Sequence, residues 1–185
     1  MPVLISMLRG VNVGGHNKIK MDALRSLYQS LKFTGCETHI QSGNVVFATT
    51  ERDLVALSTR IEKSIERKFG FRPSVILRTS AELRDVIARN PFAKRRNIDP
   101  RKFLVAFLAR DPGADAFAKL RAIKIAPEEL HCHARELYIY FPNGMARPKL
   151  SWSSIDRSLK IPVTGRNWNS VTTLLAMAEK LESPS

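Results

Sequence analysis

The segment VLISMLRGVNVGGHNKIKM, residues 3–21, holds the three features that decide the fold of this chain. Residues 3–8 are short and almost wholly apolar, which is typical of a buried strand. Residues 9–20 contain three glycines and no acidic residue, and this loop is longer than most connections between elements. From Met21 the apolar residues recur at helical spacing, with Asp22 where an acid suits a helix start. The order strand, glycine-rich loop, helix therefore opens the chain.

The following residues extend this beginning to a complete βαββαβ unit. Gly43-Asn44 is a turn signal between two strand-like runs, 36–41 and 45–49. A long amphipathic helix is predicted over residues 54–69, and a strand follows it over 74–77. The order over residues 3–79 is that of the ferredoxin-like fold. In this arrangement two helices cover one face of the sheet, and we expect the other face to be free.

The rest of the chain shows a similar order less completely. An apolar run over residues 103–108 predicts a buried strand, and a helix and a hairpin follow it. Two helices are expected at the C-terminus, and no final strand is recognised before them. We therefore expect an α+β protein with a ferredoxin-like βαββαβ first half (residues 1–80), a basic connecting segment with a short helix (81–102), and a second, related α+β half with two C-terminal helices (103–185).

Composition points to a negatively charged partner. The 185 residues include 30 lysines and arginines against 17 acids, a net charge of +13. Such a charge favours contact with nucleic acid, an anionic membrane surface or a phosphorylated small molecule. No apolar run has the length of a transmembrane helix and no secretory signal is visible, so we expect a cytoplasmic protein without a membrane partner. Cys36 and Cys132 are expected to be reduced thiols. The oligomeric state stays open.

The glycine-rich loop has the sequence context of a phosphate site. Backbone N–H groups at a helix start can hold an anion, and glycine lets a ligand approach closely. Gly10 and Gly15 have the separation of the P-loop motif, but His16 and Asn17 stand where that motif requires Lys and Ser or Thr. Magnesium-nucleotide chemistry is therefore not expected. An alternative of equal weight is that the glycines only form turns.

Two further segments contain amide or guanidinium groups that suit a ligand. Gln41 and Asn44 flank the predicted hairpin turn and could offer amides, although turn chemistry alone explains the glycine between them. Arg166 and the neighbouring amides, Asn167 and Asn169, could contact a ligand. The same segment could equally be a capped helix start anchored in the core by Trp168.

Catalytic and metal sites have little support in the sequence. There is no nucleophile elbow and no pair of carboxylates suited to general acid and base, so whether the protein is an enzyme stays open. His131 and His133 would face the same side of a strand, but spacing suggests no third ligand, and we expect no metal or cofactor. Phe47 is the one aromatic residue in the first and third predicted strands, which argues against a standard RNA-recognition motif.

Three segments together resemble the bacterial domain-of-unknown-function 1697 family. They are LRGVNVGG followed by NKIKM (residues 8–15 and 17–21), QSGNVVF (41–47) and TGRNWNSV (164–171). The resemblance implies a compact bacterial cytoplasmic α+β protein of ferredoxin-like character. It assigns no activity, substrate, cofactor or catalytic residue.

Two functions follow as hypotheses. The first is a polyanion-binding module, above all for nucleic acid, with phosphates contacted by basic residues that include 94–96. The second is an enzyme or sensor for a small phosphorylated or carboxylated ligand bound at the Gly10–Lys20 loop. A structural protein that dimerises through an open sheet face is a third possibility. The candidate ligand-binding residues are Arg9, Gly10, Asn12, Gly14, Gly15, Lys18, Lys20, Gln41, Asn44, Arg166, Asn167 and Asn169.

Overall fold

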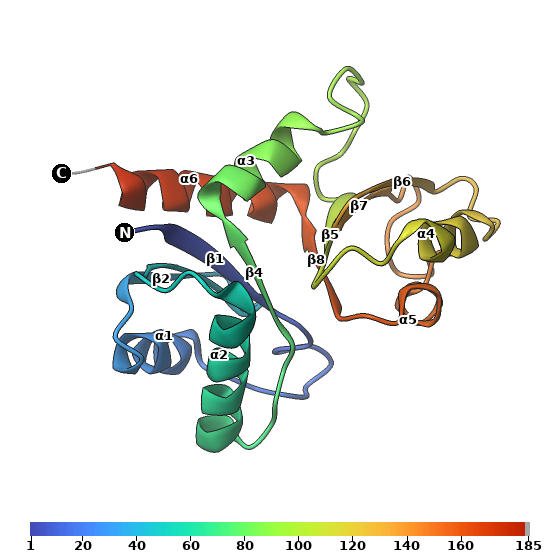
Figure 1. The fold of residues 1–185 in the computed structure, drawn as a ribbon. Coiled ribbons are helices and arrows are strands. Elements are labelled where there is room, and N and C mark those ends of the chain that lie inside the picture. The colour runs from blue at the N-terminus through green and yellow to red at the C-terminus, as the bar shows by residue number, and fades with distance from the viewer. Residues whose placement is uncertain (184–185) are drawn as a thin grey trace. The chain divides into compact units, whose positions relative to one another are not determined.

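A computed structural model describes residues 1–183, and in this range the chain forms two four-stranded antiparallel sheets and six helices (Figure 1). The chain divides into two compact units. Unit 1 is Met1–Asp85 together with the C-terminal segment from Thr172 onward, and unit 2 is Val86–Val171. None of the helices in the described residues is long and apolar enough to cross a membrane.

Unit 1 has the predicted βαββαβ order. Its sheet has the strand order β2-β3-β1-β4, the arrangement of ferredoxin-like folds. In the register, Ile5 lies opposite Val46 on one side and Arg78 on the other. The elements are β1 (Val3–Leu8), α1 (Met21–Ser30), β2 (Thr34–His39), β3 (Asn44–Ala48), α2 (Leu54–Phe69) and β4 (Val75–Thr79).

Helix α2 begins and ends where its sequence predicts. Asp53 Oδ1 accepts hydrogen bonds from the amides of Val55 and Ala56, both at 3.0 Å, and so caps the first turn. Gly70 follows the last turn in the left-handed conformation, with φ of 81°. The apolar face of α2 contributes Leu57, Ile61 and Ile65 to a core that also holds buried residues of α1, β1 and β3.

The second face of this sheet is not free, so that expectation is wrong. The β1 residues that point away from the α1–α2 core, Val3, Ile5 and Met7, are all buried. Helix α6 (Trp168–Glu182) packs on this face at β2, where Leu181 lies against Gly35. No sequence pattern pairs α6 with β2, because the two elements are far apart along the chain.

Unit 2 repeats the order of unit 1 in full. Its sheet has the order β6-β7-β5-β8, again antiparallel throughout. Helix α3 (Ser80–Ala88) follows β4 in the chain, as α6 follows β8. The elements of unit 2 are β5 (Phe103–Leu108), α4 (Ala114–Arg121), β6 (Glu129–His133), β7 (Glu136–Tyr140), α5 (Trp152–Leu159) and β8 (Val163–Asn167).

Strand β8 corrects the expectation that the second half lacks a final strand. Its sequence, VTGRN, has no apolar pattern, because Gly165 lies beneath the ring of Trp152. A Cβ at this glycine would come within 2.7 Å of Trp152 Cζ2, so a larger residue does not fit. The position that would carry an apolar strand residue is therefore filled by the tryptophan of another element.

The structural division differs from the boundaries that we expected near residues 80 and 102. It falls inside α3 and inside α6. From Val86 the chain belongs with unit 2, where Tyr138 Oη donates to the Val86 carbonyl at 2.8 Å. From Thr172 it belongs with unit 1. Continuous helical patterns contain no composition break, so the sequence does not mark these boundaries.

Candidate anion-binding site

The β1–α1 loop is a miniature hairpin. Val13 and His16 form a β-bridge, and His16 N donates to Val13 O at 3.1 Å. Between them Gly14 and Gly15 both have positive φ, 59° and 79°. Two such residues in succession are the requirement of a type I′ turn, the favoured turn of tight hairpins. The glycine pair therefore shapes the loop, which is the turn alternative that the sequence left open.

Asn12 fastens this hairpin to the rest of unit 1. Its Nδ2 donates to the carbonyls of Ile19 at 2.9 Å and Gln41 at 2.8 Å, and its Oδ1 accepts from Ile19 N at 2.9 Å. Its own amide donates to Asn17 O at 3.2 Å. Asn12 has a φ of 56°, which asparagine tolerates better than most residues. The loop after β1 and the β2–β3 turn are thus joined through one side chain.

A pocket of about 500 Å³ lies beside the joined loops. Its volume is in the range of small-molecule sites. Five of its lining residues are candidates that the sequence analysis named, and the sixth, Ile19, was missed because it reads as an ordinary apolar residue before a helix. The lining residues are Asn12, Gly15, Lys18, Ile19, Lys20 and Gln41.

The electrostatic character of this pocket is positive. Lys18 and Lys20 are exposed, and the lining contains no acidic residue. Lys20 is also the N-cap residue of α1, and its side chain does not cap the helix. The first turn of a helix leaves backbone N–H groups without intrahelical partners, and the helix dipole adds partial positive charge there. An anion in the pocket would meet two ammonium groups near this helix start.

Arg9, Gly10, Gly14 and Asn44 do not line the pocket. Arg9 is half-buried, and the Gly10 carbonyl accepts a hydrogen bond from Asn17 Nδ2 at 3.2 Å. Asn44 is fully buried at the start of β3, and its Nδ2 donates to the His39 carbonyl at 3.1 Å, which closes the β2–β3 turn. Asn44 therefore stabilises the turn and does not reach the pocket.

Arg166 lies in β8 of unit 2 and is 7% exposed. Its Nη1 donates to Thr164 Oγ1 and to the Gly165 carbonyl, both at 2.8 Å. Burial lowers the pKa of this guanidinium to about 10. The buried position makes Arg166 a poor phosphate contact for a large polyanion at the surface.

The residues after Arg166 start a helix. Asn167 Oδ1 accepts from Ser170 N at 2.9 Å, which caps α6. The ring of Trp168 stacks on Phe103 with 4.6 Å between centroids. Of the alternatives for this segment, the structure therefore has the capped helix start, with a half-buried Trp168 stacked on the buried Phe103. Asn169 is exposed in the first turn of α6, and its role as a ligand contact stays a prediction.

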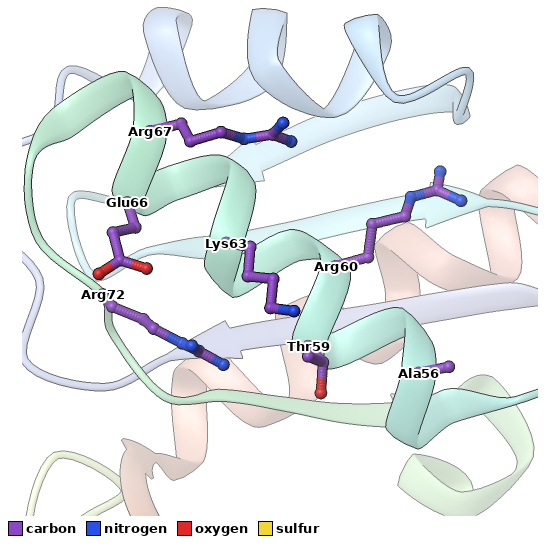
Figure 2. Close-up of a pocket in the computed structure, with 7 residues that line it drawn as sticks. All are labelled: Ala56, Thr59, Arg60, Lys63, Glu66, Arg67 and Arg72. Atoms are coloured by element: carbon purple, nitrogen blue, oxygen red, sulfur yellow. The ribbon is translucent and has the colours of Figure 1, made fainter.

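A second hollow, of about 670 Å³, follows the outer side of α2 (Figure 2). Arg72 extends from the segment after α2 on the same side of the helix as Lys63 and Thr59 (Figure 2). Arg60 pairs with Glu51 and Arg72 pairs with Glu62, while Lys63 adds a further cation. We call this hollow the α2 groove; its lining residues are Ala56, Thr59, Arg60, Lys63, Glu66, Arg67 and Arg72. Because charged residues on a helix usually form a solvated face, the sequence did not indicate the α2 groove as a site.

The thiols and histidines do not form a site within the described residues. Cys36 is buried and Cys132 half-buried, and both are free. Burial raises the pKa of both thiols, which makes them weak nucleophiles at neutral pH. His131 packs edge-on against the ring of Phe92, with 5.2 Å between centroids. In residues 1–183 no three His, Cys, Asp or Glu side chains are placed to hold a metal ion.

Comparison with known proteins agrees with the fold and supplies no activity. A solved structure, described as the conserved bacterial protein SP0830 from Streptococcus pneumoniae, superposes with a TM-score of 0.72 at 22% sequence identity. The superposition covers 96% of this chain and 98% of that chain. No curated protein matches the sequence. A protein-family model described as "Protein of unknown function (DUF1697)" matches residues 1–138, which confirms the resemblance noted in the sequence.

Proposed function

We propose, for a chain that belongs to the DUF1697 family of proteins of unknown function, that the pocket beside the β1–α1 loop binds the phosphate or carboxylate group of a small molecule. The observation that carries the proposal is that Lys18 and Lys20 line the same pocket as Asn12 and Gln41. These residues come from two loops that are separate in the sequence. A pocket with two cations and no acid favours a negatively charged group.

The proposal assigns binding and no reaction. Among the six lining residues the two exposed lysines are the only side chains of a kind that serves as a base or nucleophile, and the proposal uses them for their charge. A sensor or carrier of a small anion fits this chemistry better than an enzyme does. The loop is held by hydrogen bonds of Asn12 before a ligand arrives, so little ordering cost accompanies binding.

Thermal unfolding in the presence of inorganic phosphate and pyrophosphate tests this proposal. At a concentration 100-fold above Kd, a ligand that binds only the native state raises stability by about 2.7 kcal/mol, which corresponds to a Tm shift of about 5–11 °C for a chain of this size. The variant Lys18→Gln/Lys20→Gln should lose the shift. The matched control, Lys63→Gln, removes a cation from the α2 groove and should keep it. A wild-type protein that gives no shift at low ionic strength would contradict the proposal.

A second candidate function is binding of a polyanion, nucleic acid above all. The α2 groove favours it, since four of its seven lining residues are basic and one is acidic. The net charge of +13 would attract such a partner over a distance. This groove binds the sugar-phosphate backbone without reading bases, because its cations are long side chains on α2 and on the segment that follows it.

Salt dependence separates the two candidates. If three phosphates are contacted on a single strand, the logarithm of the binding constant should fall with the logarithm of salt concentration with a slope of about −2. Lys63→Gln/Arg67→Gln should make this slope less steep, and Lys18→Gln/Lys20→Gln should leave it unchanged. Fluorescence anisotropy with mixed-sequence DNA and RNA measures both effects. Binding that does not change with salt would exclude the second candidate.

A further inference from the structure

We propose that the ligand of the β1–α1 pocket carries an apolar group beside its anionic group, as an aryl or alkyl phosphate does. This inference rests on the proposed function and extends it from the charge of the ligand to its chemical class. Its basis is a pair of exposed apolar side chains, Val13 and Ile40, that adjoin the pocket in the chain.

Exposed large apolar side chains are few in the described residues. Val13 is 65% exposed and Ile40 is 50% exposed. Val13 directly follows Asn12, and Ile40 directly precedes Gln41, and both of those neighbours line the pocket. The complete set of exposed large apolar residues in this part of the chain is Met1, Val13, Ile40, Val55, Met145 and Trp152.

The two apolar residues are held in fixed places relative to each other. The hydrogen bond from Asn12 Nδ2 to the Gln41 carbonyl, at 2.8 Å, joins the two loops next to them. Val13 lies in the β-bridge of the small hairpin, and Leu8 N donates to Gly43 O at 3.0 Å at the base of the β2–β3 turn. Apolar groups on rigid loops give binding energy with a small loss of conformational entropy.

The backbone at Ile40 is unfavourable for the residue that occupies it. Its φ is 48°, in the left-handed region that a β-branched side chain rarely adopts. Glycine or asparagine would suit this turn position without strain. Isoleucine at this position has a strained backbone and an exposed apolar side chain, so neither backbone conformation nor burial favours it. Residues with strained backbones cluster at ligand sites. A contact with a ligand accounts for its side chain.

One of the residues that line the pocket is apolar. Ile19 lines it between Lys18 and Lys20 and is 3% exposed. The pocket therefore has an apolar residue beside its two cations, and Val13 and Ile40, which do not line it, extend from the loops that carry the lining residues Asn12 and Gln41. An inorganic ion would use the cations alone, whereas an organic phosphate would use both kinds of surface.

Isothermal titration with two probes of equal charge tests the inference. Inorganic phosphate and phenyl phosphate are both mainly dianions at pH 8, and only the second has an apolar group. Burial of part of the phenyl ring against two aliphatic side chains should make phenyl phosphate bind about tenfold more tightly. Val13→Thr/Ile40→Asn should remove this difference and leave the affinity for inorganic phosphate unchanged. Asparagine suits the left-handed backbone, so the variant is expected to fold.

The same titration includes a control variant and separates failure of the inference from failure of the proposed function. Val55→Thr alters a side chain that is 78% exposed on α2 and should preserve the tenfold preference. Equal affinity of the wild-type protein for the two probes would overturn the inference and leave the proposed function intact. A preference that persists in Val13→Thr/Ile40→Asn would also overturn it. Absence of binding by both probes would overturn the proposed function and the inference together.

Discussion

Arg78 and Arg166 occupy the same position in the two sheets. Each is the fourth residue of the fourth strand of its unit, and each lies opposite the third residue of the first strand, Ile5 and Val105 respectively. Both arginines are buried, at 1% and 7% exposure. The two units therefore share one fold, including the position of a buried arginine in the fourth strand.

The residues that follow the two arginines extend the correspondence. Thr79 Oγ1 accepts from Glu82 N at 3.1 Å, and Asn167 Oδ1 accepts from Ser170 N at 2.9 Å. Each therefore caps the helix that leaves its fourth strand. The sequences VILRT and VTGRN share only the first residue and the arginine, so the repeat is visible in the structure and not in the residues.

Replacement of Gly35 by alanine should destabilise the protein more than an ordinary glycine substitution does. An added Cβ would lie 2.9 Å from Leu181 Cδ2, at a residue with φ of 60°. The displaced Leu181 side chain and the left-handed backbone together predict a loss of about 2 kcal/mol in the free energy of unfolding. Urea denaturation measures it.

The matched control for this variant is Gly70→Ala. Gly70 also has positive φ, but an added Cβ would meet nothing within 4 Å. It should cost about 1 kcal/mol, the backbone part alone. If both variants lose the same stability, the contact between Gly35 and Leu181 is not what makes Gly35 necessary.

Replacement of Asn12 by alanine should loosen the β1–α1 loop. The variant loses three side-chain hydrogen bonds: two to Ile19 close the loop on itself, and one to Gln41 joins it to the β2–β3 turn. We expect a loss of about 2 kcal/mol and faster cleavage of the loop in limited proteolysis. Asn17→Ala is the control, since Asn17 has a similar φ of 51° but donates one such bond, to the Gly10 carbonyl. Equal effects of the two substitutions would contradict the role given to Asn12.

The hydroxyl groups of Ser6 and Tyr28 form a buried pair at 2.6 Å. Burial raises the pKa of the Tyr28 phenol, so this residue stays protonated well above its usual range. Tyr28→Phe leaves the Ser6 hydroxyl without this partner and should cost about 1–2 kcal/mol. Ser6→Ala/Tyr28→Phe should cost clearly less than the sum of the single variants in a double-mutant cycle. Additive losses would show that the two hydroxyls do not depend on each other.

Stability should fall as the pH is lowered through the titration of His39. Burial lowers the pKa of this imidazole below its ordinary 6.5, so the folded protein binds fewer protons here than the unfolded chain. The contribution is present above the unfolded pKa and is lost as the pH falls below the folded value. The free energy of unfolding should therefore decrease between pH 7.5 and about 5.5. In His39→Gln this part of the decrease should disappear, and an unchanged pH profile would contradict the assignment.

The fold of unit 1 could be predicted because local signals agree there. The apolar run of β1, the cap at Asp53 and the stop at Gly70 each act within a few residues of the chain. Strand β8 could not be predicted in the same way. Its glycine is required by Trp152, which belongs to a preceding helix, and such a contact leaves no periodic pattern in the strand itself.

Local sequence signals also predicted part of the candidate site, namely the two lysines that line the pocket. Glycines, lysines and amides at a strand–loop–helix junction indicated Lys18 and Lys20, and these line the pocket. Asn44 and Asn167 contain the same amide group, but they satisfy the backbone of a turn and a helix. Composition alone does not separate an amide that binds a ligand from one that holds the chain.

The assignment of the end of α6 to unit 1 has a consequence for synthesis on the ribosome. Leu181 lies against Gly35 of β2, so the first sheet lacks this contact until residue 181 has left the exit tunnel. Unit 1, whose strands are translated first, is therefore completed only after all of unit 2 has been translated, and a nascent chain that stops before residue 172 lacks the helical segment that lies against β2.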